Sequence, residues 1–203
     1  MVNKIIFTML LGVNTNMSDD YTRKAKLFTG KDLTDISKRQ NSTCIYCGHR
    51  VDIHHKGKFN REHIIPRAIH KWLEHNNKDN LDLDKLWAIS TSKDMVAVVH
   101  PWCNTKRGSR LITENEVDLL YLPNNIKDIL KFNIKTCDIF IKAYTNFIKS
   151  TLKKQNNCCA DCGIKIVQPK FAVLRRIDLE EYRTADNAKV LCEKCGSKHI
   201  SKK

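Results

Sequence analysis

The chain has 203 residues, enough for one medium-sized domain or two small ones, and a formal net charge of +14. Its basic residues are spread along the whole length, so the charge does not belong to a basic tail. This pattern favours a polyanionic partner, most simply nucleic acid, over the alternative of a basic protein that is merely soluble.

Residues 1–34 are interpreted as an N-terminal extension. An apolar run from Ile5 to Val13 follows Lys4, but it is short and lacks a small-residue cleavage site, so it does not resemble a signal peptide. A run of this length is also too short to span a bilayer. Met17 is an alternative translation start. We expect a cytoplasmic protein that makes no membrane contact.

Most of the nine cysteines fall in pairs with two residues between them. This is the geometry of a zinc knuckle, in which a tight turn aims two sulfurs at one ion, and it argues against the disulfide framework of a secreted protein. We expect Cys137 and Cys158, outside these pairs, to be free thiols in a reducing compartment. The pairs are Cys44/Cys47, Cys159/Cys162 and Cys192/Cys195.

The region from residue 35 to 115 is expected to form one module of mixed helices and strands. His100 and Cys103 form a second pair that can complete a tetrahedral zinc site with the first knuckle; four protein ligands leave no open position, which predicts a structural ion. The proposed ligands are Cys44, Cys47, His100 and Cys103. In chain order we expect a short helix before the knuckle, strands at 51–53, 62–65 and 95–99, and helices over 66–75 and from residue 104 onward.

Between the two pairs lies a Glu62-His63 dipeptide that can do acid–base and metal chemistry. On a strand these side chains point to opposite faces, so one can hold a metal while the other meets a water. A carboxylate and the amide oxygen of Asn104 suit a hard cation such as Mg²⁺ or Mn²⁺. A neutral His63 can take a proton from water. The alternatives are a buried histidine that only hydrogen-bonds and, for Asn104, a helix N-cap.

Two neighbouring histidines are rival bases. His54 and His55 lie in a charged loop, and we expect them to have no paired acid and to be solvated or in contact with phosphate. The helix after the second pair carries further basic residues that suit phosphate contacts, although each is equally well a solvated charge. The predicted nucleic-acid contacts are Arg67, Lys106, Arg107 and Arg110.

Taken together, the Cys-x2-Cys knuckle, the Glu-His-Ile-Ile-Pro segment and the final Cys-Asn-Thr-Lys resemble an HNH endonuclease with the ββα-metal fold, in a version with a structural zinc and an Asn as the last motif residue. The resemblance covers about residues 35–115. It implies that His63 is the general base, that Glu62 and Asn104 bind the catalytic divalent ion, and that cleavage leaves a 5′-phosphate and a 3′-hydroxyl.

The sequence departs from this family in two places. Glu62 stands where the family more often has Asp, so its carboxylate must reach one methylene further. The family's middle Asn, which steadies the catalytic loop, is replaced by Asp94 or Met95. Asp94 is able to make a similar hydrogen bond.

Residues 116–156 carry apolar side chains at helical spacing and predict a helical connector, divided into two helices by Pro123. Residues 157–203 then resemble a faded copy of the first module. Arg175 and Arg176 stand where the first module has Glu62 and His63, and Gly196 stands in place of Asn104. The copy retains a four-cysteine zinc site, with ligands Cys159, Cys162, Cys192 and Cys195.

The sequence thus predicts an α+β protein with an HNH nuclease module, a helical connector and a C-terminal zinc module. The expected activity is metal-dependent hydrolysis of DNA, with nicking by each protomer and a homodimer as a route to two cuts. One alternative is a non-catalytic zinc protein that binds nucleic acid and keeps a vestigial site. Another is a protein that cuts or binds RNA.

Overall fold

The computed structural model describes residues 28–76, 80–108, 110–169 and 172–198, and the apolar run Ile5 to Val13 and Met17 lie outside these ranges. The described chain is 46% helix and 12% strand, which confirms a mixed α and β class. Among its helices, none combines the length and the apolar character needed to cross a membrane.

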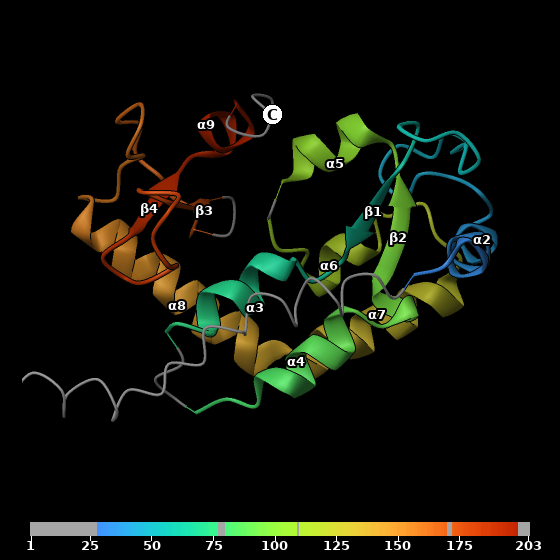
Figure 1. The fold of residues 1–203 in the computed structure, drawn as a ribbon, viewed down its shortest axis with the longest axis horizontal. Helices are drawn as coiled ribbons and strands as arrows, with labels where there is room; N and C mark the ends of the chain where they lie inside the picture. The colour runs from blue at the N-terminus through green and yellow to red at the C-terminus, as the bar shows by residue number, and fades with distance from the viewer. Residues whose placement is uncertain (1–27, 77–79, 109, 170–171, 199–203) are drawn as a thin grey trace, which may run out of the picture.

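The first half forms a short two-stranded sheet surrounded by helices (Figure 1). Strands β1 and β2 are antiparallel, with Asn60 opposite Val99 and His63 opposite Val96. The elements in chain order are α2 (Gly30–Arg39), β1 (Asn60–His63), α3 (Arg67–Leu73), α4 (Leu83–Ser90), the 3₁₀ helix η1 (Lys93–Met95), β2 (Val96–Val99) and α5 (Pro101–Arg107).

Local chemistry explains where several of these elements begin. Thr29 and Asp32 form a capping box that starts α2, since each side chain satisfies a backbone N–H of the other residue. Helix α5 begins at Pro101, whose missing N–H costs nothing in the first turn. Asn104 therefore lies in the second turn of α5. The expected helix start at Asn104 is wrong, and the N-cap is His100 instead.

Two strand predictions also need correction. The expected strand at 62–65 is β1, two residues earlier, because Ile64 and Ile65 turn into the core before α3 begins. No strand forms at 51–53; the knuckle closes instead through an isolated bridge between Thr43 and Arg50. The chain after this bridge forms bends and turns.

The connector contains α6 (Glu114–Val117), α7 (Asn124–Thr136) and α8 (Asp138–Lys154). Pro123 is the N-cap of α7, as a helix-breaking proline predicts, but a second break at Cys137 separates α7 from α8. Helix α8 packs against α3, and it runs on below β3 (Val173–Arg176) and β4 (Ala188–Leu191) (Figure 1). Its buried side chains belong to one hydrophobic core shared by both halves of the chain.

The last part, with antiparallel β3 and β4 followed by α9 (Glu193–Lys198), repeats the local structure of the first half. Gln40 and Gln155 each stand just before a knuckle and make the same bonds. The Gln40 side chain donates to the carbonyl oxygens of Thr43 and Val98 and accepts from the N–H of Val98. The Gln155 side chain has the matching three bonds, to the backbone of two residues at the corresponding places in the second half.

Backbone conformation repeats as well. Asn41 and Ser42 have positive φ angles of 55° and 53°, and Asn156 and Asn157 have 54° and 59°. An isolated bridge follows in each half, Thr43 with Arg50 and Cys158 with Lys165. The repeated unit thus starts at the end of the preceding helix, so the last turn of α8 belongs to the second unit as well as to the connector.

Candidate functional site

Two groups of four side chains are placed to bind metal ions. In each group, the ligand atoms all lie within 4.8 Å of one another. They are the groups expected from the spacing: Cys44, Cys47, His100 and Cys103, and Cys159, Cys162, Cys192 and Cys195. Sulfur and imidazole ligands in sets of four match the tetrahedral preference of Zn²⁺.

His100 is oriented for ligation by a bond on its far side. Its Nε2 lies 3.1 Å from the carbonyl oxygen of Arg50, which can only accept, so Nε2 carries the proton. Nδ1 is then free to bind a metal, and it lies 3.4 Å from Sγ of Cys47. Because His100 and Cys103 flank the start of α5, a metal bound here would fasten α5 to the knuckle.

In each group, hydrogen bonds lower the pKa of one thiol below its ordinary value. Burial opposes ionisation of Cys44, but hydrogen bonds from the backbone N–H groups of His100, Tyr46 and Cys47 outweigh it and lower the pKa of Cys44. The same kind of cradle overcomes burial in the second group and lowers the pKa of Cys159 to about 6. Thiolates are the form that binds a metal.

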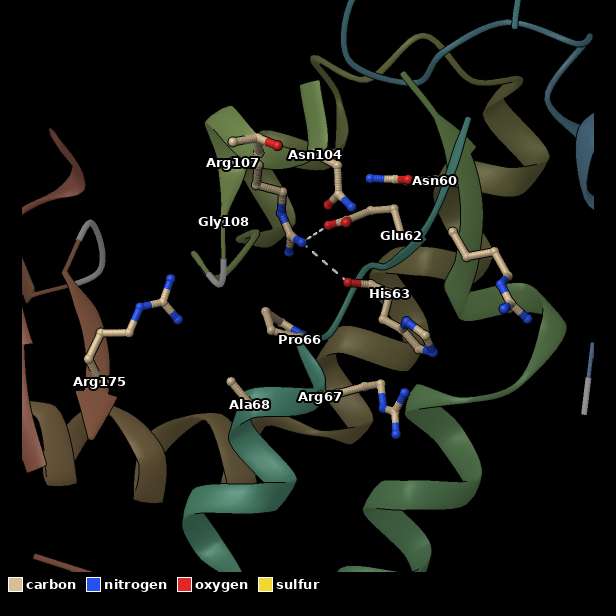
Figure 2. A pocket seen from close by; sticks show the side chains of 12 residues that line it. Asn60, Glu62, His63, Pro66, Arg67, Ala68, Asn104, Arg107, Gly108 and Arg175 are labelled. Atoms are coloured by element: carbon tan, nitrogen blue, oxygen red, sulfur yellow. Dashed lines mark hydrogen bonds and ion pairs between the residues drawn. The ribbon is translucent and has the colours of Figure 1, made fainter. Parts of the chain in front are cut away.

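A pocket of about 310 Å³ opens beside the first group, between β1 and α5 (Figure 2). It brings together the three predicted catalytic residues: Glu62 and His63 come from β1, and Asn104 comes from α5. Arg67, at the start of α3, also lines it.

Glu62 is the most enclosed of the three, with only 4% of its surface exposed. Its carboxylate forms an ion pair with Arg107 and accepts a hydrogen bond from the hydroxyl of Tyr46 at 3.1 Å. Burial raises the pKa of Tyr46 to about 12, so this hydroxyl keeps its proton. Figure 2 shows the carboxamide of Asn104 beside the Glu62 carboxylate. Two oxygen-bearing groups therefore meet at one end of the pocket.

The imidazole of His63 leaves β1 away from the Glu62 carboxylate and lies next to Arg67 (Figure 2). Burial, followed by the positive charges of Arg67 and Arg61, lowers the pKa of His63 to about 4. The ring is therefore neutral near pH 7. Within the described residues it has no hydrogen-bond partner, which disfavours the alternative of a histidine held only for its hydrogen bonds.

The rival bases lie elsewhere. His54 and His55 are exposed and do not line this pocket. The expectation that they lack an acid is wrong for His55, because its Nδ1 contacts the carboxylate of Asp52. That pair is open to solvent, where an ion pair contributes little.

The predicted phosphate contacts separate into three groups. Arg67 lines the pocket and lies over the ring of Trp87, 5.3 Å from its centroid. Lys106 is exposed, and Arg110 forms an ion pair with Glu116. Lys106 and Arg110 both line a second pocket next to the first. Arg107 is 6% exposed. In addition to its ion pair with Glu62, it donates to the carbonyl oxygens of His63 at 3.3 Å and Ile64 at 2.7 Å. It is placed to hold β1 and α5 together.

Sequence reasoning missed the pairing of Arg107 with Glu62 and the contribution of Tyr46. A usable signal was present for the first: Arg107 follows Asn104 by three residues on a helix, so both side chains face β1. Nothing in the spacing pointed to Tyr46.

The loop-steadying position differs between the two units. In the second unit, the side chain of Asn187 donates to the carbonyl oxygens of Asp178 and Tyr182 and accepts from the N–H of Asp178. In the first unit, the corresponding strand position holds the buried Met95. Asp94, the residue before Met95, forms an ion pair with Arg39 of α2 at 2.8 Å and does not make bonds like those of Asn187 within the described residues.

Comparisons with known proteins returned no match: no family model, no curated protein and no solved structure matches this chain.

Proposed function

We propose that this protein is a metal-dependent endonuclease of the HNH type that hydrolyses DNA phosphodiester bonds. One observation carries the proposal: Glu62, His63 and Asn104 line a single pocket next to a four-ligand Cys/His group. The net charge of +14 supports a polyanionic substrate. The fold that goes with this function is a ββα-metal unit, here β1, β2 and α5.

His63 is the general base. Its lowered pKa keeps the ring neutral, and a neutral imidazole accepts the proton of a water that attacks the phosphorus. The absence of a hydrogen-bond partner among the described residues leaves its ring nitrogens available to that water. The water adds to phosphorus as one of its protons moves to His63, and the bond from phosphorus to the 3′-oxygen breaks. The departing oxygen takes a proton from solvent, which leaves a 5′-phosphate and a 3′-hydroxyl.

Glu62 and Asn104 fit a hard divalent cation by the chemistry of their donors, a carboxylate and an amide oxygen at one end of the pocket. Held by these two residues, a Mg²⁺ or Mn²⁺ ion would supply positive charge that stabilises the transition state and the leaving oxygen. Arg107 already neutralises Glu62, so a cation and this guanidinium compete for the same carboxylate.

The Cys/His group serves as a staple. It joins the knuckle to the first turn of α5, and α5 carries Asn104 towards β1. Zn²⁺ bound by four protein ligands has no open position, so its role here is structural.

The test is a plasmid-nicking assay with Mg²⁺ or Mn²⁺. The unsubstituted protein should convert supercoiled DNA to the nicked form, and His63→Ala should abolish this. His54→Ala is the matched control, because His54 is exposed and outside the pocket. Equal nicking by His63→Ala and the unsubstituted protein would contradict the proposed base.

The Glu62–Arg107 ion pair favours a second candidate, a non-catalytic zinc protein that binds nucleic acid with a vestigial site. In that case the arginine stands in place of the cation. DNA binding without any nicking, in either metal, would select this candidate. A parallel digestion of single-stranded RNA separates the DNA nuclease from an RNA nuclease.

A further inference from the structure

The second unit carries a positive side chain at a position where the candidate site in the first unit carries a negative one. The strand pairs match by register: Asn60 opposite Val99 in the first unit corresponds to Val173 opposite Leu191 in the second. Counting along each strand, Arg175 takes the place of Glu62. A cation therefore occupies the position where the first unit offers a metal-binding carboxylate.

Arg175 is not isolated from the first unit, because it lines the same pocket as His63 and Arg67. Figure 2 shows its side chain reaching from β3 towards this pocket. One terminal nitrogen donates to the carbonyl oxygen of Gly196 at 3.3 Å, while Nε has no hydrogen-bond partner within the described part of the chain. The pocket thus has a basic wall from each unit.

Further cations lie where the chain just after α3 meets the second unit. There Asn76 donates to the carbonyl oxygen of Arg183, and the ring of His75 contacts that of Tyr182. We name this group the α3–β3 seam. All of its members are partly buried, and no ion pair within the described residues includes any of them. The seam consists of Arg67, Lys71, Arg175, Arg176 and Arg183.

These charges are close enough to act on one another. Burial, and then the charges of Arg183 and Arg67, lower the pKa of Lys71. Among the described residues, the carboxylate of Glu74 opposes this effect on Lys71 and on Arg183. Crowded, half-buried cations with so little compensation favour binding of a polyanion, which replaces repulsion with attraction.

We propose that the α3–β3 seam binds backbone phosphates of the substrate beside the phosphate that is cut, so that the second unit serves as a substrate grip. The identity of the ligand as DNA rests on the proposed nuclease function. The seam begins at Arg67 in the candidate active pocket and continues through Lys71 on the same face of α3, so one strand can lie along both. Phosphate contacts of this kind position a substrate without reading its sequence.

The experiment measures DNA binding separately from cleavage. Every variant carries His63→Ala, and binding of a fluorescein-labelled DNA duplex is followed by anisotropy at several salt concentrations without added divalent metal. The seam variant is Lys71→Ala with Arg183→Ala, whose side chains make no hydrogen bond within the described residues. The control is Lys31→Ala with Lys135→Ala, which removes the same charge from exposed sites on α2 and α7.

We expect the slope of log K against log salt to fall by about 2 in the seam variant, because two phosphate contacts are lost, and to change little in the control. Arg175→Ala, checked for a full complement of bound zinc, should lower the slope by about 1. Equal slopes for the seam and control variants would overturn the proposal. So would a seam variant that loses binding to poly-glutamate while keeping the DNA slope, because the seam would then be a protein-binding surface.

The results separate this inference from the proposed function. If DNA binding depends on the seam but the protein never nicks DNA, the phosphate-binding role of the seam is supported and the nuclease function is contradicted. If the protein nicks DNA but its DNA binding does not depend on the seam, the nuclease function is supported and the phosphate-binding role of the seam is contradicted.

Discussion

Arg107 on α5 forms a buried ion pair with Glu62 on β1, the carboxylate that stands beside Asn104. The same guanidinium donates to the carbonyl oxygen of Ile64 at 2.7 Å, where the chain leaves β1. One side chain therefore fixes the distance between the strand and the helix that build the candidate site. It also sets how much negative charge Glu62 offers to a cation.

Removing Arg107 alone should destabilise the fold. Arg107→Met leaves Glu62 as an unpaired buried charge, which costs about 3–5 kcal/mol. Adding Glu62→Gln should recover part of this loss, since the buried charge is then gone. Urea unfolding of the single and double variants measures both effects. A double variant that is less stable than Arg107→Met would show that the ion pair is not the source of the cost.

The nicking rate should depend on pH through His63. Its pKa of about 4 means that protonation inactivates the base only in strongly acidic solution. We expect kcat/KM to stay level from about pH 8 down to about pH 5 and to fall below that. An acidic fall centred near pH 6.5, the ordinary value for histidine, would contradict the lowered pKa.

Neutralising Arg67 should shift the acidic limb of the pH–rate profile, where kcat/KM falls, to higher pH. A nearby positive charge disfavours the protonated imidazole, so Arg67→Gln raises the pKa of His63 and shifts the limb to higher pH. Arg61→Gln is the matched comparison and should give a smaller shift, because its charge acts less strongly on His63. The position of the limb, rather than the height of the profile, is the quantity to compare. A limb that stays at the same pH in both variants would remove the electrostatic explanation.

The two metal groups should be separable. Elemental analysis should find one zinc for each of the two groups, and Cys103→Ser and Cys195→Ser should each lose one. Cys103→Ser should also abolish nicking, because α5 and Asn104 are then no longer fastened to the knuckle. Full zinc content in Cys103→Ser would argue against the first group as a metal site.

The glutamine before each knuckle, Gln40 or Gln155, should contribute to the stability of the fold through its bonds to the backbone. Gln40 is 1% exposed and satisfies both the N–H and the carbonyl oxygen of Val98. Gln40→Ala leaves these buried groups unpaired and should cost about 1–3 kcal/mol. Gln155→Ala, at the less buried copy of this position, should cost less. Thermal or urea unfolding of the two variants tests the order.

The sequence could locate the features that depend on neighbours in the chain. The spacing of the cysteine pairs and of His100 with Cys103 predicted both four-ligand groups, and Pro123 predicted the start of α7, because each pattern involves only a few consecutive residues. Alternation along a strand was enough to place Glu62 and His63 on opposite sides. The start of α5 was misplaced, although Pro101 carried the signal for it.

Contacts between distant segments were decided by the tertiary structure alone. The spacing of Arg107 and Asn104 indicates that both side chains face β1, but it does not show that Arg107 is buried against Glu62. Nor does spacing show that Tyr46 donates to the same carboxylate, or that Arg175 lines the pocket of the other unit. These relationships depend on how β1, α5 and β3 pack over a shared core, and packing is a property of the whole chain rather than of any one stretch. The sequence determined which chemical groups are available, and the packing determined which of them meet.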